Sequence, residues 1–353
     1  MHGRTRASAL LLAAPLAFLL ACSEPENGER GSSGAGSAST SGGSGGDGGS
    51  GGDGGVDGSG GVGGSGGDGG GSGDVAHGRD VGAANTGIAG AIAAGLPCGQ
   101  LTDYEGPYIV DVPGTVIENK RIVGAIKILA DDVTVRCCDV DLDGEVDARG
   151  IWIGYETNPS GWRVEWNTIH GGATGTIGID VTTSGDGVCR RNDVSQQENG
   201  MRLSGGRVEE NYLHDPLPYD GIAHRDQIEI YGTSQPTSVL RNRIEHDGEE
   251  TAAINITYDF GPTDDVLIKD NFIDGGNYTL YDREQGSGMP TRVRFVGNQH
   301  GDSFFYGLIS ADREGTSDPE VQAAAPERFL WQDNTWAETA DPAHPEGELI
   351  PVP

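Results

Sequence analysis

Hydrophobic and polar positions recur in a short phrase along the second half of the chain. The phrase reads apolar, any, any, Asn, any, apolar, and its copies are VRCCDV, VEWNTI, CRRNDV, VEENYL, VLRNRI, IKDNFI, FVGNQH and WQDNTW. Cys138 replaces Asn in the first copy, and the polar column is otherwise Asn167, Asn192, Asn211, Asn242, Asn271, Asn298 and Asn334. Apolar residues fill the position three before this column and the position two after it, where His300 is the exception. Repetition at this period is the signature of a stacked solenoid.

A second alternating segment lies between successive copies of the phrase. These segments are GIWIG (150–154), GIDVT (178–182), GMRLS (200–204), QIEIY (227–231), AINIT (253–257) and YTLYD (278–282). Alternation bounded by turn residues predicts half-buried strands. Their first apolar positions are 22 to 28 residues apart, which suits one coil of a parallel β-helix. The sequence therefore predicts an all-β fold, a single-stranded right-handed parallel β-helix of about eight rungs.

The Asn column has a structural explanation. An Asn at a bend can bond neighbouring backbone and tolerate left-handed torsions, and stacked Asn side chains can bond one another. We therefore expect these residues to stabilise the fold rather than to catalyse. The apolar stretch GIAGAIAAG (87–95) predicts a short N-terminal helical cap, because an uncovered end rung would expose core and an unpaired edge.

The N-terminus predicts a processed leader. Arg4 and Arg6 precede an apolar run that is too short for a stable membrane span, so residues 1–22 are expected to be a signal peptide. The run ends in LLAC (19–22), which resembles a bacterial lipobox with Cys22 as the lipidated residue. Ser23, by resemblance to Gram-negative lipoproteins, suggests an outer-membrane or cell-surface location. Simple secretion with an unrelated Cys22 is the alternative.

Composition divides the rest of the chain. More than half of residues 31–73 are Gly, with mostly Ser and Asp between them, so residues 23–83 predict a disordered tether that cannot bury a core. Residues 84–340 are expected to form the β-helix domain, and residues 341–353 a Pro-rich tail. We expect a monomer that meets the membrane only through its lipid anchor.

Charge and cysteine content narrow the function. The formal net charge is -31, which argues against nucleic acid as a partner and disfavours polyanionic substrates unless a cation bridges the two. Cys189 falls in an inward column, so a buried thiol is expected there. Cys98 could pair with Cys137 or with Cys138 in an oxidising compartment.

Polar residues form a row on the outward side of the second strands. Residues in the same outward position of neighbouring rungs should lie about 4.8 Å apart. Gln227 and Tyr231 flank this row. Its members, in rung order, are Trp152, Asp180, Arg202, Glu229 and Asn255. The plain interpretation is a surface salt-bridge ladder that adds little stability.

A long loop directly precedes the strand that carries Glu229, and it favours a functional interpretation of the row. Asn211 and Asn242 are 31 residues apart, whereas Asn192 and Asn211 are 19 apart, so about a dozen residues are inserted. Loops on a rigid scaffold commonly carry chemistry. The insert carries His214, Asp215, Asp220, His224, Arg225 and Asp226. A second polar cluster, with Tyr281 and Arg283, follows two rungs later.

Two reactions can be written on these residues. For hydrolysis, Asp180 and Glu229 would be two rungs apart, roughly 9–10 Å, near the upper end for an inverting carboxyl pair. Asp226 and Glu229 offer a closer pair. For β-elimination, a base must remove the proton α to a uronate carboxylate while a cation neutralises the acid. The candidates there are His224, Arg225 and Arg202, and Ca²⁺ bound among Asp215, Asp220 and Asp226 could serve as the cation.

The segments VIENKRIVGAIKILADDVTVRCCDV, GMRLSGGRVEENYLHD and HRDQIEIYG resemble bacterial right-handed parallel β-helix proteins of the pectate-lyase-like superfamily. The resemblance covers about residues 105–338, and it implies a polysaccharide lyase or a glycoside hydrolase acting on an extracellular glycan. Expected sugar contacts are Trp152, Gln227, Tyr231, Asn255, Tyr281 and Arg283. The alternatives are a non-catalytic surface lipoprotein that binds glycan through the same face and a purely structural lipoprotein.

Overall fold

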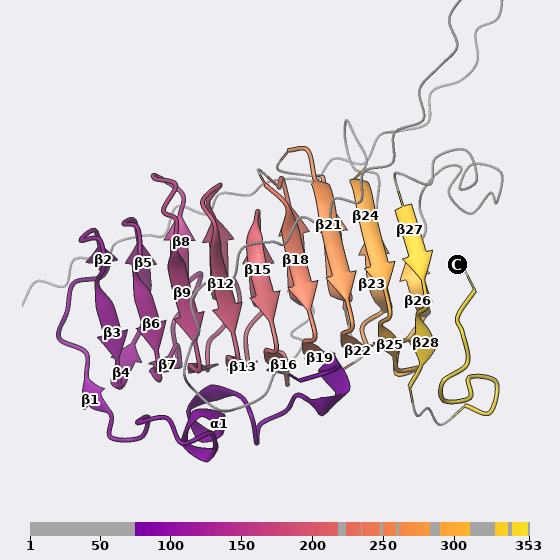
Figure 1. Ribbon diagram of the computed structural model, residues 1–353, viewed down its shortest axis with the longest axis horizontal. Coiled ribbons are helices and arrows are strands. Elements are labelled where there is room, and N and C mark those ends of the chain that lie inside the picture. Colours follow the sequence, from indigo (N-terminus) through magenta and orange to yellow (C-terminus); the bar gives the residue numbers. More distant parts are fainter. Residues whose placement is uncertain are drawn as a thin grey trace, which may run out of the picture. The chain divides into compact units, whose positions relative to one another are not determined.

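Three parallel sheets wind around a common interior in the computed structural model (Figure 1). The described residues are 75–217, 224–233, 235–247, 250–258, 261–282, 290–310, 329–337 and 341–351. The chain passes through the three sheets in turn in each coil, so every strand pairs with the strand three elements away. The fold is the predicted right-handed parallel β-helix, with nine or ten strands in each sheet where the sequence suggests about eight rungs.

Each sheet is defined by its strands. Sheet A contains β1 (Thr102–Asp103), β4 (Lys120–Val123), β7 (Asp139–Asp141), β10 (Thr168–His170), β13 (Asp193–Ser195), β16 (Tyr212–His214), β19 (Arg243–Glu245), β22 (Phe272–Asp274), β25 (Gln299–His300) and β28 (Thr335–Trp336). Sheet B contains β2 (Ile109–Val110), β5 (Ile126–Ile128), β8 (Arg149–Gly154), β11 (Ile177–Thr182), β14 (Asn199–Leu203), β17 (Asp226–Tyr231), β20 (Ala252–Thr257), β23 (Tyr278–Asp282) and β26 (Gly307–Ser310). Sheet C contains β3 (Val116–Glu118), β6 (Thr134–Arg136), β9 (Trp162–Glu165), β12 (Gly187–Arg190), β15 (Gly206–Glu209), β18 (Thr237–Leu240), β21 (Asp264–Lys269), β24 (Thr291–Val296) and β27 (Phe329–Gln332).

The predicted apolar columns line the interior. On sheet C the column runs in strand register from Val135 through Val164, Cys189 and Val208 to Trp331, and its members are buried. The inward positions of the other two sheets are filled mainly by Ile, Val, Leu and Met, with His300 and Trp336 at the C-terminal end of sheet A. Because each inward side chain stacks on one of similar size in the next rung, the repeat builds one continuous core.

The Asn column forms the corner between sheets C and A, and it is a hydrogen-bonded ladder. The amide of Asn192, for example, donates to Asn211 Oδ1 at 2.9 Å and to the carbonyl of Val164 at 2.8 Å, and its backbone N–H also donates to Asn211 Oδ1. The same pattern continues through Asn334, and all seven side chains are fully buried. The left-handed torsion falls on the residue before each Asn, such as Arg191 with φ 57°, and not on the Asn itself. The structural role predicted for the column is confirmed.

Replacing Asn211 by Ala is expected to lower the free energy of unfolding by about 1–3 kcal/mol, because buried partners lose their hydrogen bonds. The variant loses the hydrogen bond that Asn211 donates to the Cys189 carbonyl. It also loses the two hydrogen bonds that Asn211 Oδ1 accepts from the backbone and side-chain N–H groups of Asn192. Thermal and denaturant unfolding of the two proteins measures the change. Asn158→Ala is the control, since Asn158 is exposed and, among the described residues, its side chain accepts a single hydrogen bond, from the Ser184 amide. Equal losses from both variants would contradict the ladder's role.

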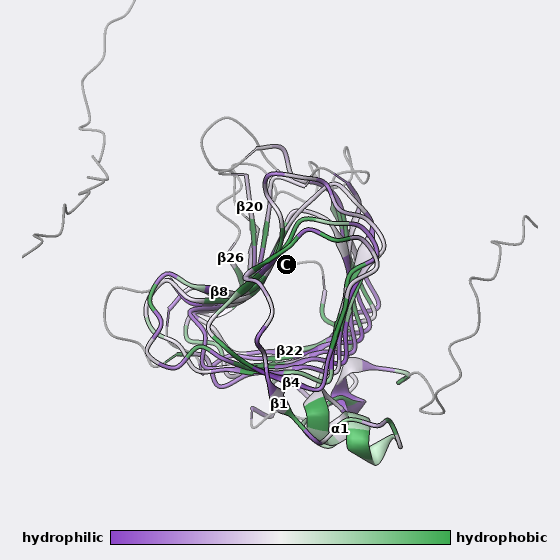
Figure 2. Ribbon diagram, turned by 90° about the vertical axis from the view of Figure 1, so that its left-hand side faces the viewer, coloured by the Kyte–Doolittle hydropathy of each residue, from purple (hydrophilic) through white to green (hydrophobic). Residues whose placement is uncertain are grey.

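The predicted helix forms as α1 (Gly87–Ala93), but its expected position over the end rung is wrong. The amide of Gly87 donates to the carbonyl of Arg191 at 2.8 Å, and that of Ile88 donates to Thr168 Oγ1 at 3.2 Å. The helix therefore lies outside the solenoid against sheet A (Figure 2). It reaches this place because the preceding 3-10 turn (Gly78–Asp80) is bound farther along the same corner, where Gly78 donates to the carbonyl of Asp270.

The segment from the 3-10 turn to Cys98 (residues 78–98), called the N-terminal strap below, is fixed at its end by a disulfide. Cys98 pairs with Cys137, the residue before the first position of the Asn ladder, which decides between the two expected partners. Cys138 and Cys189 are buried thiols, as predicted for Cys189. Residues before position 84 also contact the coil, through the Gly78 amide.

The C-terminal segment also belongs to the folded unit. Ile350 is buried, its carbonyl accepts a hydrogen bond from Trp331 Nε1 at 3.0 Å, and Thr335 forms an antiparallel bridge with Leu349. The ring of His344 stacks on Trp336 with centroids 4.0 Å apart. Residues 341–351 therefore pack against the last coil and extend the domain beyond residue 340.

The predicted signal peptide, Cys22 and most of the tether lie outside the described residues, as do Asp220 and Arg283. In the described part of the chain, no helix is long and apolar enough to cross a membrane.

Candidate functional site

The polar row predicted from the sequence exists on the outer face of sheet B. Strand pairing places Trp152 beside Asp180, Asp180 beside Arg202, Arg202 beside Glu229, and Glu229 beside Asn255. The column continues in both directions, through Lys127 on one side and Tyr281 on the other. Asp180 and Glu229 therefore lie two strand spacings apart, about 10 Å, on either side of Arg202.

Two side chains from other strands of sheet B hold Asp180: Arg149 on the adjacent β8 and Tyr231 on β17, two strands away. Arg149 Nε lies 2.6 Å from Asp180 Oδ2, and Tyr231 Oη donates to Asp180 Oδ1 at 3.1 Å. Burial raises the pKa of Asp180, although the charges of Arg202 and Arg149 oppose the rise. Both carboxylate oxygens are engaged and the residue is 1% exposed, so Asp180 supports the site rather than meeting a ligand.

Glu229 is the carboxylate of the row that solvent reaches. Arg202 Nε lies 2.7 Å from Glu229 Oε2, and 13% of the Glu229 side chain is exposed. The amide of Asn199 approaches the same oxygen at 3.5 Å. Burial alone would lower the pKa of Arg202, but the negative charge of Glu229, with smaller effects of Tyr231 and Asp180, raises it. Arg202 is thus fixed as a cation and cannot act as the base of an elimination.

Asp226 lies beside Glu229 in a different environment. Asn255 Nδ2 donates to Asp226 Oδ2 at 3.1 Å, while the buried Oδ1 has no hydrogen-bond partner among the described residues. Burial first, and then the negative charge of Glu229, raises the pKa of Asp226 well above its ordinary value. Oδ1 is therefore the oxygen on which a proton can reside. Two neighbouring carboxyl groups in such different environments are the arrangement that acid–base catalysis requires.

Two residues expected at the site point elsewhere. Gln227 is buried, and its amide donates to the carbonyl of Glu245 at 2.7 Å across the corner with sheet A. Arg225 is fully buried and forms a double hydrogen bond with Asp247, at 2.8 and 2.9 Å. Both were expected to face a substrate, and both instead hold the corner that precedes β17. His224 is exposed next to this corner.

The expected sugar-stacking aromatics are mostly covered. Tyr231 and Tyr281 are buried, and the guanidinium of Arg202 lies 4.6 Å from the Tyr231 ring centroid. Trp152 is half-buried, with Lys127 Nζ 4.2 Å and the Arg149 guanidinium 4.6 Å from its ring centroid. The ring faces of these three residues are therefore not open platforms.

Asp215, one of the three carboxylates proposed to bind Ca²⁺, is paired with a histidine. The Asp215 carboxylate lies 2.8 Å from His214 Nδ1, and His214 Nε2 lies 2.9 Å from Asp193. His214 belongs to sheet A, whereas Asp226 begins a strand of sheet B. Across the described ranges, no group of three or more His, Cys, Asp or Glu side chains is arranged to hold a metal ion.

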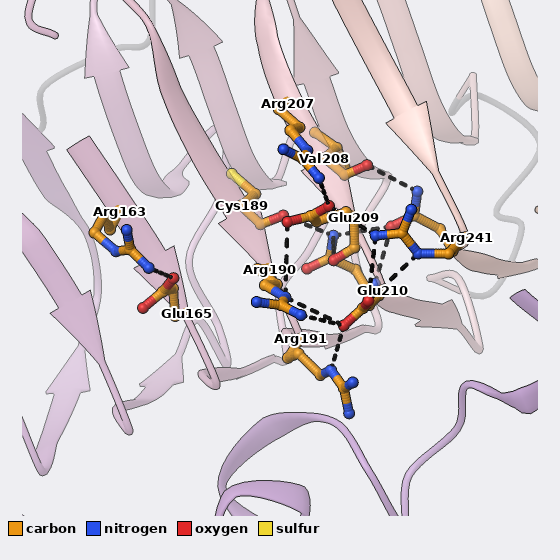
Figure 3. A network of polar contacts seen from close by, with 12 residues as sticks. Arg163, Glu165, Cys189, Arg190, Arg191, Arg207, Val208, Glu209, Glu210 and Arg241 are labelled. Atoms are coloured by element: carbon orange, nitrogen blue, oxygen red, sulfur yellow. Dashed lines mark hydrogen bonds and ion pairs between the residues drawn. The ribbon is translucent and has the colours of Figure 1, made fainter. Parts of the chain in front are cut away.

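A second dense polar cluster lies at the corner of sheets C and A (Figure 3). Glu210 is fully buried, with Arg191 at 2.6 Å, Arg190 at 3.1 Å and Arg241 at 3.3 Å, and Glu209 shares Arg241 at 3.0 Å. Arg191 also donates to the carbonyl of Asn85 in the N-terminal strap. Since both carboxylates are paired with arginines and Arg191 ties the strap to the solenoid, we interpret the cluster as structural.

Several site residues were missed in the sequence. Arg149 and Asn199 precede the alternating part of their strands, so the alternation gave no signal for them. Lys127 is not among the residues that the sequence assigned to the row, although strand pairing puts it in the same column, where its Nζ lies 2.8 Å from Glu156. The aligned strand positions could have placed Lys127 in the row.

No protein-family model matches the chain, and a search of curated proteins gives no match.

Proposed function

We propose that the outer face of sheet B is the active site of a glycoside hydrolase that acts on an extracellular polysaccharide. The observation that carries the proposal is the pair formed by Asp226 and Glu229. Asp226 is 4% exposed with a raised pKa, and its Oδ1 has no hydrogen-bond partner in the part of the chain that the structure describes. Glu229 is ion-paired with Arg202 and reaches solvent. Asp226 retains the proton, and Glu229 is the charged carboxylate that meets the sugar or activates water.

Elimination has weaker support in the same geometry. Arg225 is buried against Asp247, and Arg202 is ion-paired with Glu229, which removes two of the three expected bases. The third, His224, is exposed beside the corner and not within the row. Resemblance to the pectate-lyase-like superfamily agrees with either reaction, and the carboxyl pair favours hydrolysis. The lipobox-like segment adds that the enzyme is anchored at the cell surface or outer membrane by Cys22, as a monomer on a long tether.

The test is an activity screen of the full chain against neutral and uronic polysaccharides, with calcium and with a chelator. We expect new reducing ends without the ultraviolet absorbance of unsaturated uronate, and no loss of activity in the chelator. The Glu229→Gln variant should be inactive on the same substrates. Absorbance that rises with the reducing ends would identify a lyase and overturn the proposal. Binding to an immobilised polysaccharide without any cleavage would favour the non-catalytic glycan-binding alternative.

A further inference from the structure

An exposed aromatic platform stands at the C-terminal end of sheet B. It consists of Tyr278, Phe305 and Tyr306. Phe305 is 71% exposed and Tyr306 is 64% exposed, and their rings are perpendicular with centroids 4.7 Å apart. The Tyr306 ring lies 5.6 Å from that of Tyr278. Large exposed aromatic side chains that gather in one place mark a binding surface.

The platform is rigidly placed. The amides of Phe305 and Tyr306 donate to the carbonyls of Gly276 and Asn277 at 3.0 and 2.8 Å, so both residues are fixed to the preceding coil. Tyr278 is backed by the buried Tyr281, whose ring meets it edge-on with centroids 5.4 Å apart. Aromatic rings held in this way lose little conformational entropy on binding, which favours their use in recognition.

The platform continues the candidate active site along the same face. Strand pairing connects Asp226 through Ala252 to Tyr278, and then Tyr278 to Gly307, the residue after Tyr306. Tyr278 therefore lies two strand spacings, about 10 Å, from Asp226 along the solenoid axis. A chain bound along the face would reach the platform a few units from the carboxyl pair.

The charge around the platform indicates which kind of sugar it would bind. The described residues of β20, β23 and β26 and of the segment 301–306 contain no Lys or Arg. Asp302 lies within this segment, and Asp274 accepts a hydrogen bond from the Ser303 amide. Among the described residues, this surface therefore offers no cation to the carboxylates of a uronate chain. Aromatic faces pack well on the C–H faces of neutral sugar rings, whose hydroxyl groups can remain hydrated.

We propose that Tyr278, Phe305 and Tyr306 form a subsite that binds neutral sugar residues of the polysaccharide cleaved at Asp226 and Glu229. The inference rests on the proposed function for the identity of the ligand as a glycan. It adds that the substrate carries neutral sugars on the side of the cleavage point that faces the C-terminal coils.

Calorimetric titration of the full-length Glu229→Gln protein with oligosaccharides tests the subsite. The probes are neutral hexasaccharides (maltohexaose, cellohexaose, xylohexaose and mannohexaose) and, for comparison, hexagalacturonate. We expect at least one neutral probe to bind, and the added pair Phe305→Ala and Tyr306→Ala to weaken its binding roughly tenfold or more. Tyr108→Ala is the matched control, because Tyr108 is an exposed aromatic residue next to β2, seven strands from β23 in the same sheet.

The outcomes separate this inference from the proposed function. Neutral probes that bind equally well with and without the Phe305 and Tyr306 side chains would overturn the subsite, even if the protein is a hydrolase. Binding of hexagalacturonate alone would also overturn it. Binding that depends on both rings in a protein that cleaves none of the polysaccharides would support the subsite and contradict the proposed hydrolase.

Discussion

The Asp226→Asn variant is expected to lose most of its activity and yet to be more stable than the wild type at neutral pH. The activity loss should be about 10²–10⁴-fold, the usual contribution of a general acid, because an amide has no acidic proton to pass to the leaving oxygen. The carboxamide oxygen of the variant can take the place of Asp226 Oδ2 and still accept the hydrogen bond from Asn255, so this contact is preserved. Opposite effects on activity and stability are typical of a group retained for function.

The pH dependence of the stability gain follows from the raised pKa of Asp226. Between the unfolded pKa near 3.8 and the higher folded pKa, the folded state binds more protons than the unfolded state. The free energy of unfolding of the wild type therefore falls as the pH rises through this interval. The Asn variant lacks this loss, so its advantage should be absent near pH 3 and should grow as the pH rises.

Unfolding curves from pH 3 to pH 8 and rates on the best substrate of the screen measure the two effects together. Asp103→Asn is the matched control, because Asp103 is an exposed carboxylate of sheet A far along the chain from the site, and it should change neither quantity. A variant that is destabilised at neutral pH would show that the wild-type carboxyl is ionised and well paired. An active variant would exclude Asp226 as the proton donor.

How much of the site follows from the sequence depends on the regularity of the coil. The row from Trp152 to Asn255 could be predicted because alternation and the repeat period fix which residues share a column, and strand pairing confirms each step. The orientation of Gln227, in contrast, could not be predicted from the alternation. A Cβ added to Gly200 would meet Gln227 Oε1 and Leu213, so Gln227 points inward, and Ile228 after it is buried in the core as well. Two successive inward residues at the corner break the alternation and turn Asp226 towards the site.

Contacts between segments that are far apart in the chain could not be predicted from the sequence either. The N-terminal strap reaches the carbonyl of Asp270, and the disulfide joins its end to a corner residue whose position depends on the whole coil. The platform of Phe305 and Tyr306 lies outside the repeated strands, so the alternating pattern assigned them no face. Residues in the repeat were predictable, whereas those at corners, ends and connections were set by tertiary contacts.

His300 breaks the apolar column of sheet A, and the structure makes this exception costly. The side chain is fully buried between Ile273 and Trp336 in the strand register, and its ring stacks on Trp331 with centroids 5.5 Å apart. Neither ring nitrogen has a hydrogen-bond partner among the described residues. An unsatisfied buried polar group costs about 1–3 kcal/mol. Burial, aided by the nearby His77, lowers the pKa of His300 to about 3.

Replacing His300 by Leu is therefore expected to stabilise the protein, by about 1–3 kcal/mol at neutral pH. Between pH 6.5 and about 3 the unfolded wild type binds a proton that folded His300 does not, so wild-type stability falls as the pH decreases. The advantage of the Leu variant should grow by up to about 1.4 kcal/mol for each pH unit in that interval, and stay constant below it. Unfolding of both proteins at pH 4, 5.5 and 7 measures the difference, and His300→Phe repeats the test with a ring in the same place. A difference that does not depend on pH would mean that folded His300 accepts a proton, and a loss of stability in both variants would mean that its ring nitrogens are satisfied in solution.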